Sequence, residues 1–132
     1  MFIKLYSSAT DENTLHPLTI SLHKQSRVLE IVYNNGENFK LPCEYLRVFS
    51  PSADVKGHGP GQEVLQLGKE NVNIKEVEPV GNYAVRLIFD DGHDTGLYTW
   101  NYLYELGQNQ KSNWIDYLHA LNKSGHKRKQ DG

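Results

Sequence analysis

The sequence contains a single cysteine, Cys43, and this scarcity excludes several kinds of site. One cysteine cannot form a disulfide within the chain, and it cannot supply the thiolates of an all-cysteine metal or iron–sulfur site. Disulfide-free chains are typical of reducing compartments. We expect Cys43 to be a buried structural residue, because free cysteine is among the residue types that are most often buried.

Long apolar runs are also missing. Nowhere do 18 apolar residues follow one another, and the N-terminus has neither the basic start nor the apolar centre of a secretory signal. Positive charge is not concentrated, because 16 Asp and Glu residues accompany the 14 Lys and Arg residues. Binding to a phosphate backbone needs a broad basic surface. These absences predict a cytoplasmic protein that binds neither membranes nor nucleic acids.

Alternation of apolar and polar residues predicts an α+β fold, with mostly antiparallel β-hairpins and short helices. Strong turn signals at Asn34-Asn35-Gly36 and Asp91-Gly92 each join two strands. Thr99 is suited to cap a short helix that Gly107 would end. The expected strands cover residues 18–23, 27–33, 39–41, 72–77, 83–89 and 97–98, and the short helices cover residues 43–49 and 100–106.

The two halves of the chain share this order of elements. When Gly36 is placed on Gly92, VYNNG matches IFDDG, and Tyr45-Leu46 matches Tyr102-Leu103 after one inserted residue. An internal repeat and the chance recurrence of a common hairpin motif both account for this match.

An amphipathic helix is expected at residues 110–122, with Trp114, Leu118 and Leu121 on its packing face, Ile115 and Tyr117 beside them, and Ser124-Gly125 at its end. The chain is long enough for one domain, which we assign to residues 1–122 with a core at about 18–106. Residues 123–132 are basic and lack apolar anchors, so we expect a disordered tail.

A connection of twenty residues, 50–69, joins the halves without hydrophobic periodicity. Such long loops in compact domains are usually functional or disordered. Its glycine-rich part, residues 57–61, is superficially similar to a phosphate-binding loop. No strand is predicted before it, however, and the Lys-Ser/Thr pair that would contact phosphate and magnesium is missing.

Ionisable residues gather at the second turn, where Asp91, His93 and Asp94 follow Asp90. Imidazole and carboxylate groups bind zinc or iron together, so His93 and His58 with nearby acids form a candidate metal site. Alternatively, His93 is a turn residue that forms hydrogen bonds within its own loop. No nucleophile with a dedicated base is evident, and we assign no catalytic residue.

Three segments together resemble the gamma-butyrobetaine hydroxylase-like N-terminal domain family: FSPSAD, GHGPGQE and VEPVGNYAVRLIFDDGHDTGLYTWNYLYELG. The resemblance covers about residues 18–106. It implies a mixed domain of antiparallel strands and short helices. Such domains occur alone in bacteria, at the N-terminus of carnitine-pathway oxygenases, and attached to Mrp-type ATPases that carry iron–sulfur clusters.

In the oxygenases, the resemblance implies a zinc site of three closely spaced cysteines after a Leu-Arg pair and one histidine in a D-x-H turn. Leu46-Arg47 matches the pair, so the cysteine positions fall on Ser50, Ser52 and Val55 and the histidine on His93. Neither serine nor valine replaces a thiolate as a zinc ligand. The family's zinc is therefore expected to be absent, and no cofactor is expected. The oxygenase's iron and 2-oxoglutarate sites belong to another domain.

Two classes of function remain open. The first is a non-catalytic accessory domain that binds a protein, such as an oxygenase or an Mrp-type ATPase, through a surface formed by Asp91, His93, Asp94, Tyr98 and Trp100. The second is a domain that handles iron, zinc or a cluster through His93 and His58, with Cys43 of a second subunit as a further ligand in a homo-oligomer. The missing cysteine triplet favours the first class.

Overall fold

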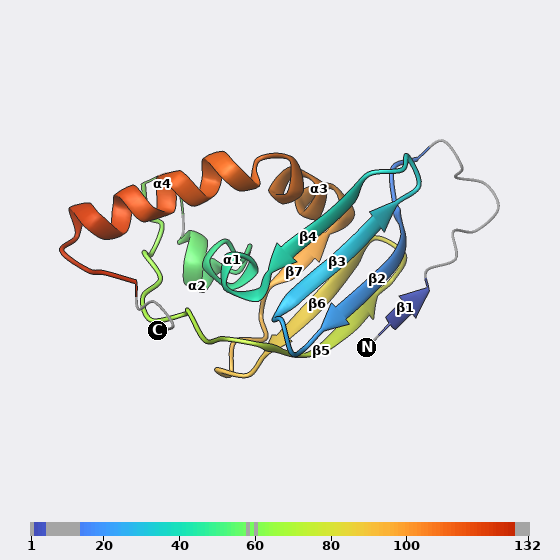
Figure 1. Cartoon of the computed structure of the whole chain (residues 1–132), viewed down its shortest axis with the longest axis horizontal. Coiled ribbons are helices and arrows are strands. Elements are labelled where there is room, and N and C mark those ends of the chain that lie inside the picture. The colour runs from blue at the N-terminus through green and yellow to red at the C-terminus, as the bar shows by residue number, and fades with distance from the viewer. Residues whose placement is uncertain (1, 5–13, 58, 60, 129–132) are drawn as a thin grey trace.

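The structure is a computed structural model that describes residues 2–4, 14–57, 59 and 61–128. Two antiparallel sheets and four helices make up the described chain, as the sequence predicts for an α+β fold (Figure 1). One sheet has the order β1 (Phe2–Lys4), β2 (Pro17–His23), β3 (Val28–Tyr33), β4 (Asn38–Pro42), and the other the order β5 (Ile74–Val80), β6 (Ala84–Phe89), β7 (Leu97–Thr99). The helices are α1 (Cys43–Val48), α2 (Ala53–Lys56), α3 (Trp100–Gln108) and α4 (Gln110–Lys123).

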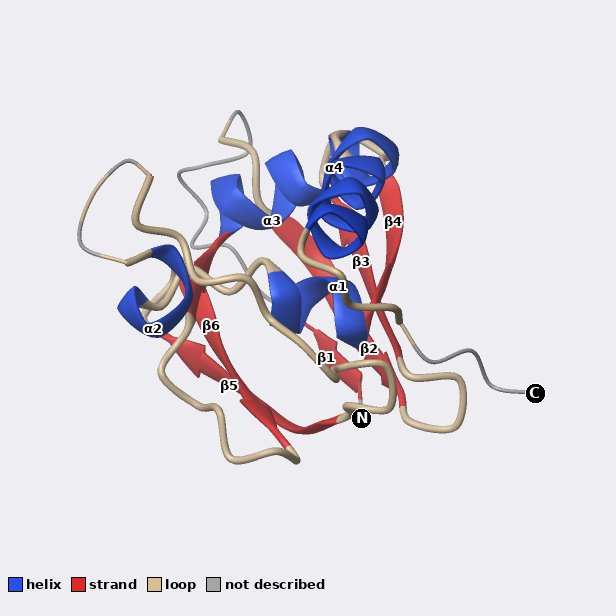
Figure 2. Ribbon diagram, turned by 90° about the vertical axis from the view of Figure 1, so that its left-hand side faces the viewer, coloured by secondary structure: helices blue, strands red, loops and turns tan. Residues whose placement is uncertain are grey.

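Both sheets contribute to one hydrophobic core. Alternate residues of β3 and β6 are buried, which is the pattern of strands with one face toward a core. Helices α1 and α3 close this core, and Figure 2 shows α1 between the strands of the two sheets. Cys43 is completely buried, as predicted. The largest completely buried side chains are Tyr33, Tyr45, Tyr98, Phe89, Ile20, Leu29, Ile31, Leu41, Leu46, Ile74, Leu87 and Leu103.

The two predicted turns have the same geometry. Gly36 has a φ of 90° and Gly92 a φ of 92°, a backbone conformation that residues with a Cβ rarely adopt. Each glycine N–H donates to a carbonyl three residues earlier, on Tyr33 at 3.0 Å and on Phe89 at 3.2 Å. The hairpin that continues into a helix therefore occurs twice, as β3-β4-α1 and as β6-β7-α3.

Gly107 does not end a helix as predicted, because α3 continues through it to Gln108. A Cβ on Gly107 would lie 2.5 Å from Cγ of Phe39. The missing side chain therefore permits close packing of α3 on β4, a role that local sequence signals cannot distinguish from a helix stop. Strand β5 also differs from the prediction of 72–77, because pairing with β6 continues until Val80 lies opposite Ala84.

Helix α4 is amphipathic, and its packing face includes two of the three predicted residues, Trp114 and Leu121, but not Leu118. Tyr117 and Leu121 are buried and Trp114 is partly buried, whereas Leu118 is exposed. The Tyr117 hydroxyl donates to the Gln66 carbonyl at 2.7 Å, which fixes this rotation of the helix. None of the helices in the described ranges has the length and apolarity needed to cross a membrane.

The segment predicted as a disordered tail begins inside the last helix, since Lys123 belongs to α4. Residues 124–128 follow, and Arg128 contacts Glu44 of α1. Residues 129–132 lie outside the described residues.

Candidate functional site

His93 and Ser50 are brought into direct contact, with 2.8 Å between Nε2 of the histidine and Oγ of the serine. The His93 backbone N–H donates to Oδ1 of Asp91 at 3.1 Å, and its carbonyl accepts from the N–H of Phe89 at 3.0 Å. These bonds fix the turn, and Ser50 is completely buried beside it. The contact joins the β6–β7 turn to the segment after α1.

The other two positions that the resemblance assigns to cysteines lie beside this contact. Ser52 caps α2, because its hydroxyl accepts from the Asp54 N–H at 3.1 Å. The Thr95 hydroxyl from the turn lies 3.0 Å from the Ser52 hydroxyl. Val55, the third residue of α2, is buried. The structure therefore gathers Ser50, Ser52 and Val55 next to the turn that carries His93, and sequence reasoning did not predict α2.

The ligands at these four positions do not fit zinc. Only His93 offers a common zinc ligand, since serine hydroxyls are poor ligands and valine has no donor atom. Across the described ranges, no three His, Cys, Asp or Glu side chains are close enough to hold a metal ion. The second predicted ligand, His58, lies outside the described residues.

The surroundings of His93 favour the neutral imidazole. Burial and then the positive charge of Arg47 lower the pKa of His93, against the opposing effect of nearby Asp91 and Asp54. A neutral ring can accept a hydrogen bond from the Ser50 hydroxyl through Nε2. Cys43 is completely buried, and this burial raises the pKa of its thiol to about 11, so the thiol is protonated at neutral pH.

Asp91 connects three segments of the chain. Its Oδ2 accepts from Nε of Arg47 at 2.8 Å and from Nζ of Lys69 at 3.1 Å. Burial acts to raise the pKa of Asp91, but the hydrogen bonds from the His93 N–H, Arg47 and Lys69 together hold it below the ordinary value. The Arg47 guanidinium also donates to Gln66 at 3.1 Å. Asp91 therefore helps to fix the 50–69 connection.

Two of the five residues predicted for a partner surface are buried instead. The Tyr98 hydroxyl donates to the Leu46 carbonyl at 2.6 Å, and Nε1 of Trp100 donates to the Asn82 carbonyl at 2.8 Å. Both aromatic residues thus find polar partners inside the protein, and they are not available to a partner. Of the predicted surface, Asp91 and Asp94 are exposed and His93 is partly exposed.

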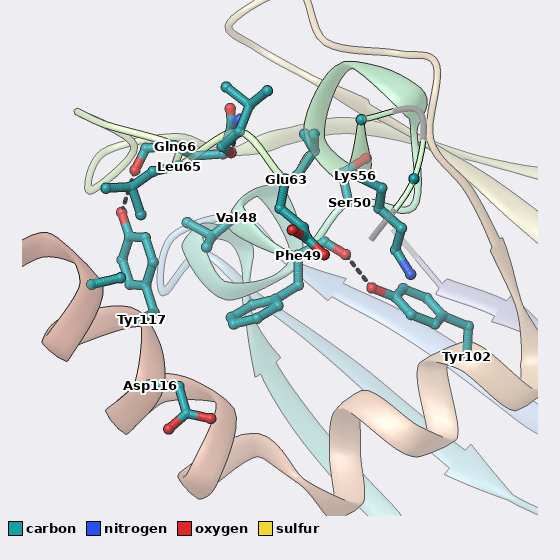
Figure 3. A pocket seen from close by; sticks show the side chains of 15 residues that line it. Val48, Phe49, Ser50, Lys56, Glu63, Leu65, Gln66, Tyr102, Asp116 and Tyr117 are labelled. Atoms are coloured by element: carbon teal, nitrogen blue, oxygen red, sulfur yellow. Dashed lines mark hydrogen bonds between the residues drawn. The ribbon is translucent and has the colours of Figure 1, made fainter. Parts of the chain in front are cut away.

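Ser50 also lines a groove that the sequence did not reveal (Figure 3). It has a volume of about 770 Å³ and runs between α1, α2, α4 and the segment after α2. Its lining is mainly apolar, and includes Val48, Phe49, Val55, Val64 and Leu65. The unusual length of the 50–69 connection was the only sequence signal for it.

The tyrosine hydroxyls in this groove are paired within the protein. The Tyr102 hydroxyl donates to the Phe49 carbonyl at 2.5 Å, and the Tyr117 hydroxyl donates to Gln66 (Figure 3). Nζ of Lys56 lies 4.4 Å from the centre of the Tyr102 ring, a cation–π contact. Two exposed acids, Glu63 and Asp116, also line the groove. The groove thus combines an apolar floor with a charged rim.

Comparison with solved structures finds relatives along nearly the whole chain. Two NMR solution structures each share 50% sequence identity with it, with TM-scores of 0.76 and 0.75. The first alignment covers 93% of this chain and 90% of the relative, and the second covers 89% and 92%. No curated protein matches the chain.

A crystal structure of a protein of unknown function from Acidithiobacillus ferrooxidans, of the DUF971 family, shares 42% identity with a TM-score of 0.59. That alignment covers 70% of this chain and 92% of the relative. The family described as gamma-butyrobetaine hydroxylase-like, N-terminal, matches residues 20–104. This match takes in β3 to β7 together with α1, α2 and most of α3, and it shows that the chain belongs to the gamma-butyrobetaine hydroxylase-like N-terminal domain family.

Proposed function

We propose that this protein is a non-catalytic accessory domain that binds an apolar segment of another protein in the groove between α1, α2 and α4. The proposal rests on the groove itself, which has a volume of about 770 Å³ and a mainly apolar lining. The tyrosine hydroxyls of its wall are hydrogen-bonded within the protein. Large concave apolar surfaces with few polar groups are typical of binding sites.

The polar groups of the groove favour binding over chemistry. The hydroxyls of Tyr102 and Tyr117 are already bonded to backbone carbonyls, so they orient the groove wall and have little freedom to act on a substrate. Burial raises the pKa of Tyr102 to about 12, which keeps this hydroxyl protonated at neutral pH. Ser50 and His93 form a close pair, but Ser50 is completely buried.

The rim charges suggest the chemistry of the partner. Lys56 is held above the Tyr102 ring, whereas Glu63 and Asp116 are exposed. An apolar segment flanked by a basic residue would fill the groove and place its positive charge beside these acids. By the family resemblance, we propose a partner in a carnitine-type oxygenase system or an Mrp-type iron–sulfur ATPase system.

Purified candidates of both classes test the proposal by isothermal titration calorimetry. Val64 lines the groove and is 53% exposed, so Val64→Glu should weaken binding at least about tenfold without unfolding the protein. Leu18 on β2 is 43% exposed and lies outside the groove, so Leu18→Glu is the matched control. The proposal would be overturned if the protein bound neither class of candidate, or if Val64→Glu and Leu18→Glu weakened binding equally.

A further inference from the structure

The end of α4 turns the chain back toward the body of the protein. The N–H of His126 donates to the Leu121 carbonyl at 3.0 Å, and the N–H of Gly125 donates to the Asn122 carbonyl at 3.1 Å. With Gly125 at a φ of 84°, these two bonds form a Schellman motif. The basic residues that follow are thereby directed to α1.

Arg128 then forms a forked ion pair with Glu44 in the first turn of α1. Its Nε lies 2.7 Å from Oε2 and 2.9 Å from Oε1 of Glu44, and its terminal nitrogen lies 2.6 Å from Oε1. The Glu44 side chain is only 8% exposed, whereas that of Arg128 is 34% exposed. In the pair, the carboxylate on α1 therefore lies deeper than the guanidinium, which belongs to the segment after α4.

An aromatic residue completes the surroundings of the guanidinium. Cζ of Arg128 lies 5.8 Å from the centre of the Trp114 ring, within the range of cation–π attraction. Glu44, Trp114 and Arg128 all line a second groove, of about 770 Å³, which also includes Tyr45 and Ile115. This groove is much larger than one guanidinium group, so it has room for more than the Arg128 side chain.

A carboxylate paired this way selects arginine. A guanidinium donates two parallel hydrogen bonds to one carboxylate and can also lie over an aromatic ring, whereas the lysine ammonium is a single charged point. A buried carboxylate left without a cation is strongly destabilising. Any occupant of this position therefore needs the chemistry that Arg128 supplies.

We propose that Glu44 and Trp114 form an arginine-binding site, that Arg128 occupies it as an internal ligand, and that an arginine of a partner protein takes it when the tail is displaced. This site lies in the second groove, not in the groove between α1, α2 and α4 that is proposed to bind an apolar segment. The arginine site therefore does not depend on that proposed function. Charge complementarity with a buried carboxylate identifies the occupant as a guanidinium-bearing segment.

A peptide with the sequence of the tail tests the site on the full chain. Acetyl-Gly-His-Lys-Arg-amide should bind the Arg128→Ala variant at least about tenfold more tightly than wild type, because the internal ligand is gone. Its binding should also restore the lowered melting temperature of that variant. The same peptide ending in lysine should bind more weakly, since it cannot form the forked pair.

The variant Glu44→Gln/Arg128→Ala provides the control, because removing both members of a buried ion pair is tolerated better than removing one. It should fold and bind neither peptide. Equal binding of the peptide by wild type and Arg128→Ala, no binding by either, or equal binding of the arginine and lysine peptides would overturn the proposal. A wild-type dimer in sedimentation equilibrium that Arg128→Ala dissociates would assign the site to the tail of a second copy instead.

Discussion

Tyr45 of α1 and Tyr102 of α3 form equivalent hydrogen bonds in opposite directions. The Tyr45 hydroxyl donates to the Leu106 carbonyl at 2.6 Å, and the Tyr102 hydroxyl donates to the Phe49 carbonyl at 2.5 Å. The two acceptors are also equivalent, because Phe49 lies four residues after Tyr45 and Leu106 lies four residues after Tyr102. This reciprocity is what a self-complementary interface between two related units produces. The similarity between the halves of the sequence is therefore also a similarity of contacts.

Removal of either hydroxyl should destabilise the protein. We expect Tyr45→Phe and Tyr102→Phe each to lower the free energy of unfolding by about 1 to 2 kcal/mol, because a carbonyl at the end of the facing helix loses its donor. Tyr45→Phe should cost more, since the Tyr45 hydroxyl also accepts from Asn113 at 3.0 Å. Denaturant unfolding measures both values.

Tyr83→Phe serves as the control, because Tyr83 is half exposed and its loss of a hydroxyl should change stability by less than about 0.5 kcal/mol. An equally small effect of Tyr45→Phe and Tyr102→Phe would contradict the reciprocal bonding.

The packing of α3 on β4 gives a prediction with an unexpected sign. Alanine usually stabilises a helix interior relative to glycine by about 1 kcal/mol. Gly107→Ala should instead destabilise this protein by about 1 to 3 kcal/mol, because the added Cβ overlaps the Phe39 ring. In a Phe39→Ala background the same substitution should become favourable. Urea unfolding of wild type, Gly107→Ala, Phe39→Ala and the double variant completes this double-mutant cycle. A Gly107→Ala substitution that stabilises the wild-type background would contradict the close packing.

The sequence correctly predicted the turns and helix ends that depend only on neighbouring residues. The turns at Gly36 and Gly92, the Thr99 cap and the Gly125 helix end depend on a few adjacent residues, and the structure confirms them. Gly107 depends on a contact with a distant strand, so its sequence neighbours gave the wrong role.

The candidate site was predicted less completely for the same reason. In the DGH turn, Asp91 and His93 both make contacts between distant segments, which the sequence pattern did not specify. Aromatic residues in a polar motif looked exposed, but Tyr98 and Trp100 reach backbone carbonyls inside the protein. The groove lies between segments far apart in the sequence, and no local pattern marks such a surface.

Stability should depend on pH through His93. The unfolded chain takes up a proton near the ordinary value of 6.5, whereas burial and Arg47 lower the pKa of His93 in the folded state. The folded state therefore binds fewer protons between the two values, and its stability is complete above 6.5 and falls as the pH drops toward the folded pKa. His93→Gln should lose less stability than wild type between about pH 7 and pH 5.

Thermal or denaturant unfolding at several pH values measures this difference. The exposed His119→Gln provides the matched control and should follow wild type. If His93→Gln and wild type lose stability in parallel, His93 is not the residue responsible.

The positions beside His93 should accept a zinc site once thiolates are supplied. We expect the triple variant Ser50→Cys, Ser52→Cys, Val55→Cys to bind about one zinc ion per chain, because three thiolates and one imidazole form a common structural zinc site. Zinc should also raise its melting temperature. Metal analysis of untagged protein should find no stoichiometric zinc or iron in wild type.

His93→Ala in the same triple variant should weaken zinc binding, which distinguishes a four-ligand site from a loose thiol cluster. Stoichiometric metal in wild type that His93→Ala removes would instead support the metal-handling function. Failure of the triple variant to bind zinc while still folded would contradict the proposed placement of the ligands.

The groove between α1, α2 and α4 is the proposed binding site for a partner protein. NMR titration of the ¹⁵N-labelled protein with a purified oxygenase or Mrp-type ATPase tests this site. The measured quantity is the chemical-shift change of each backbone amide. We predict that the changes concentrate at groove residues such as Val64, Asp116 and Ala120, while Leu18 on β2 stays unchanged. Changes concentrated on the sheet around Leu18, or no changes with either class of partner, would contradict binding in the groove.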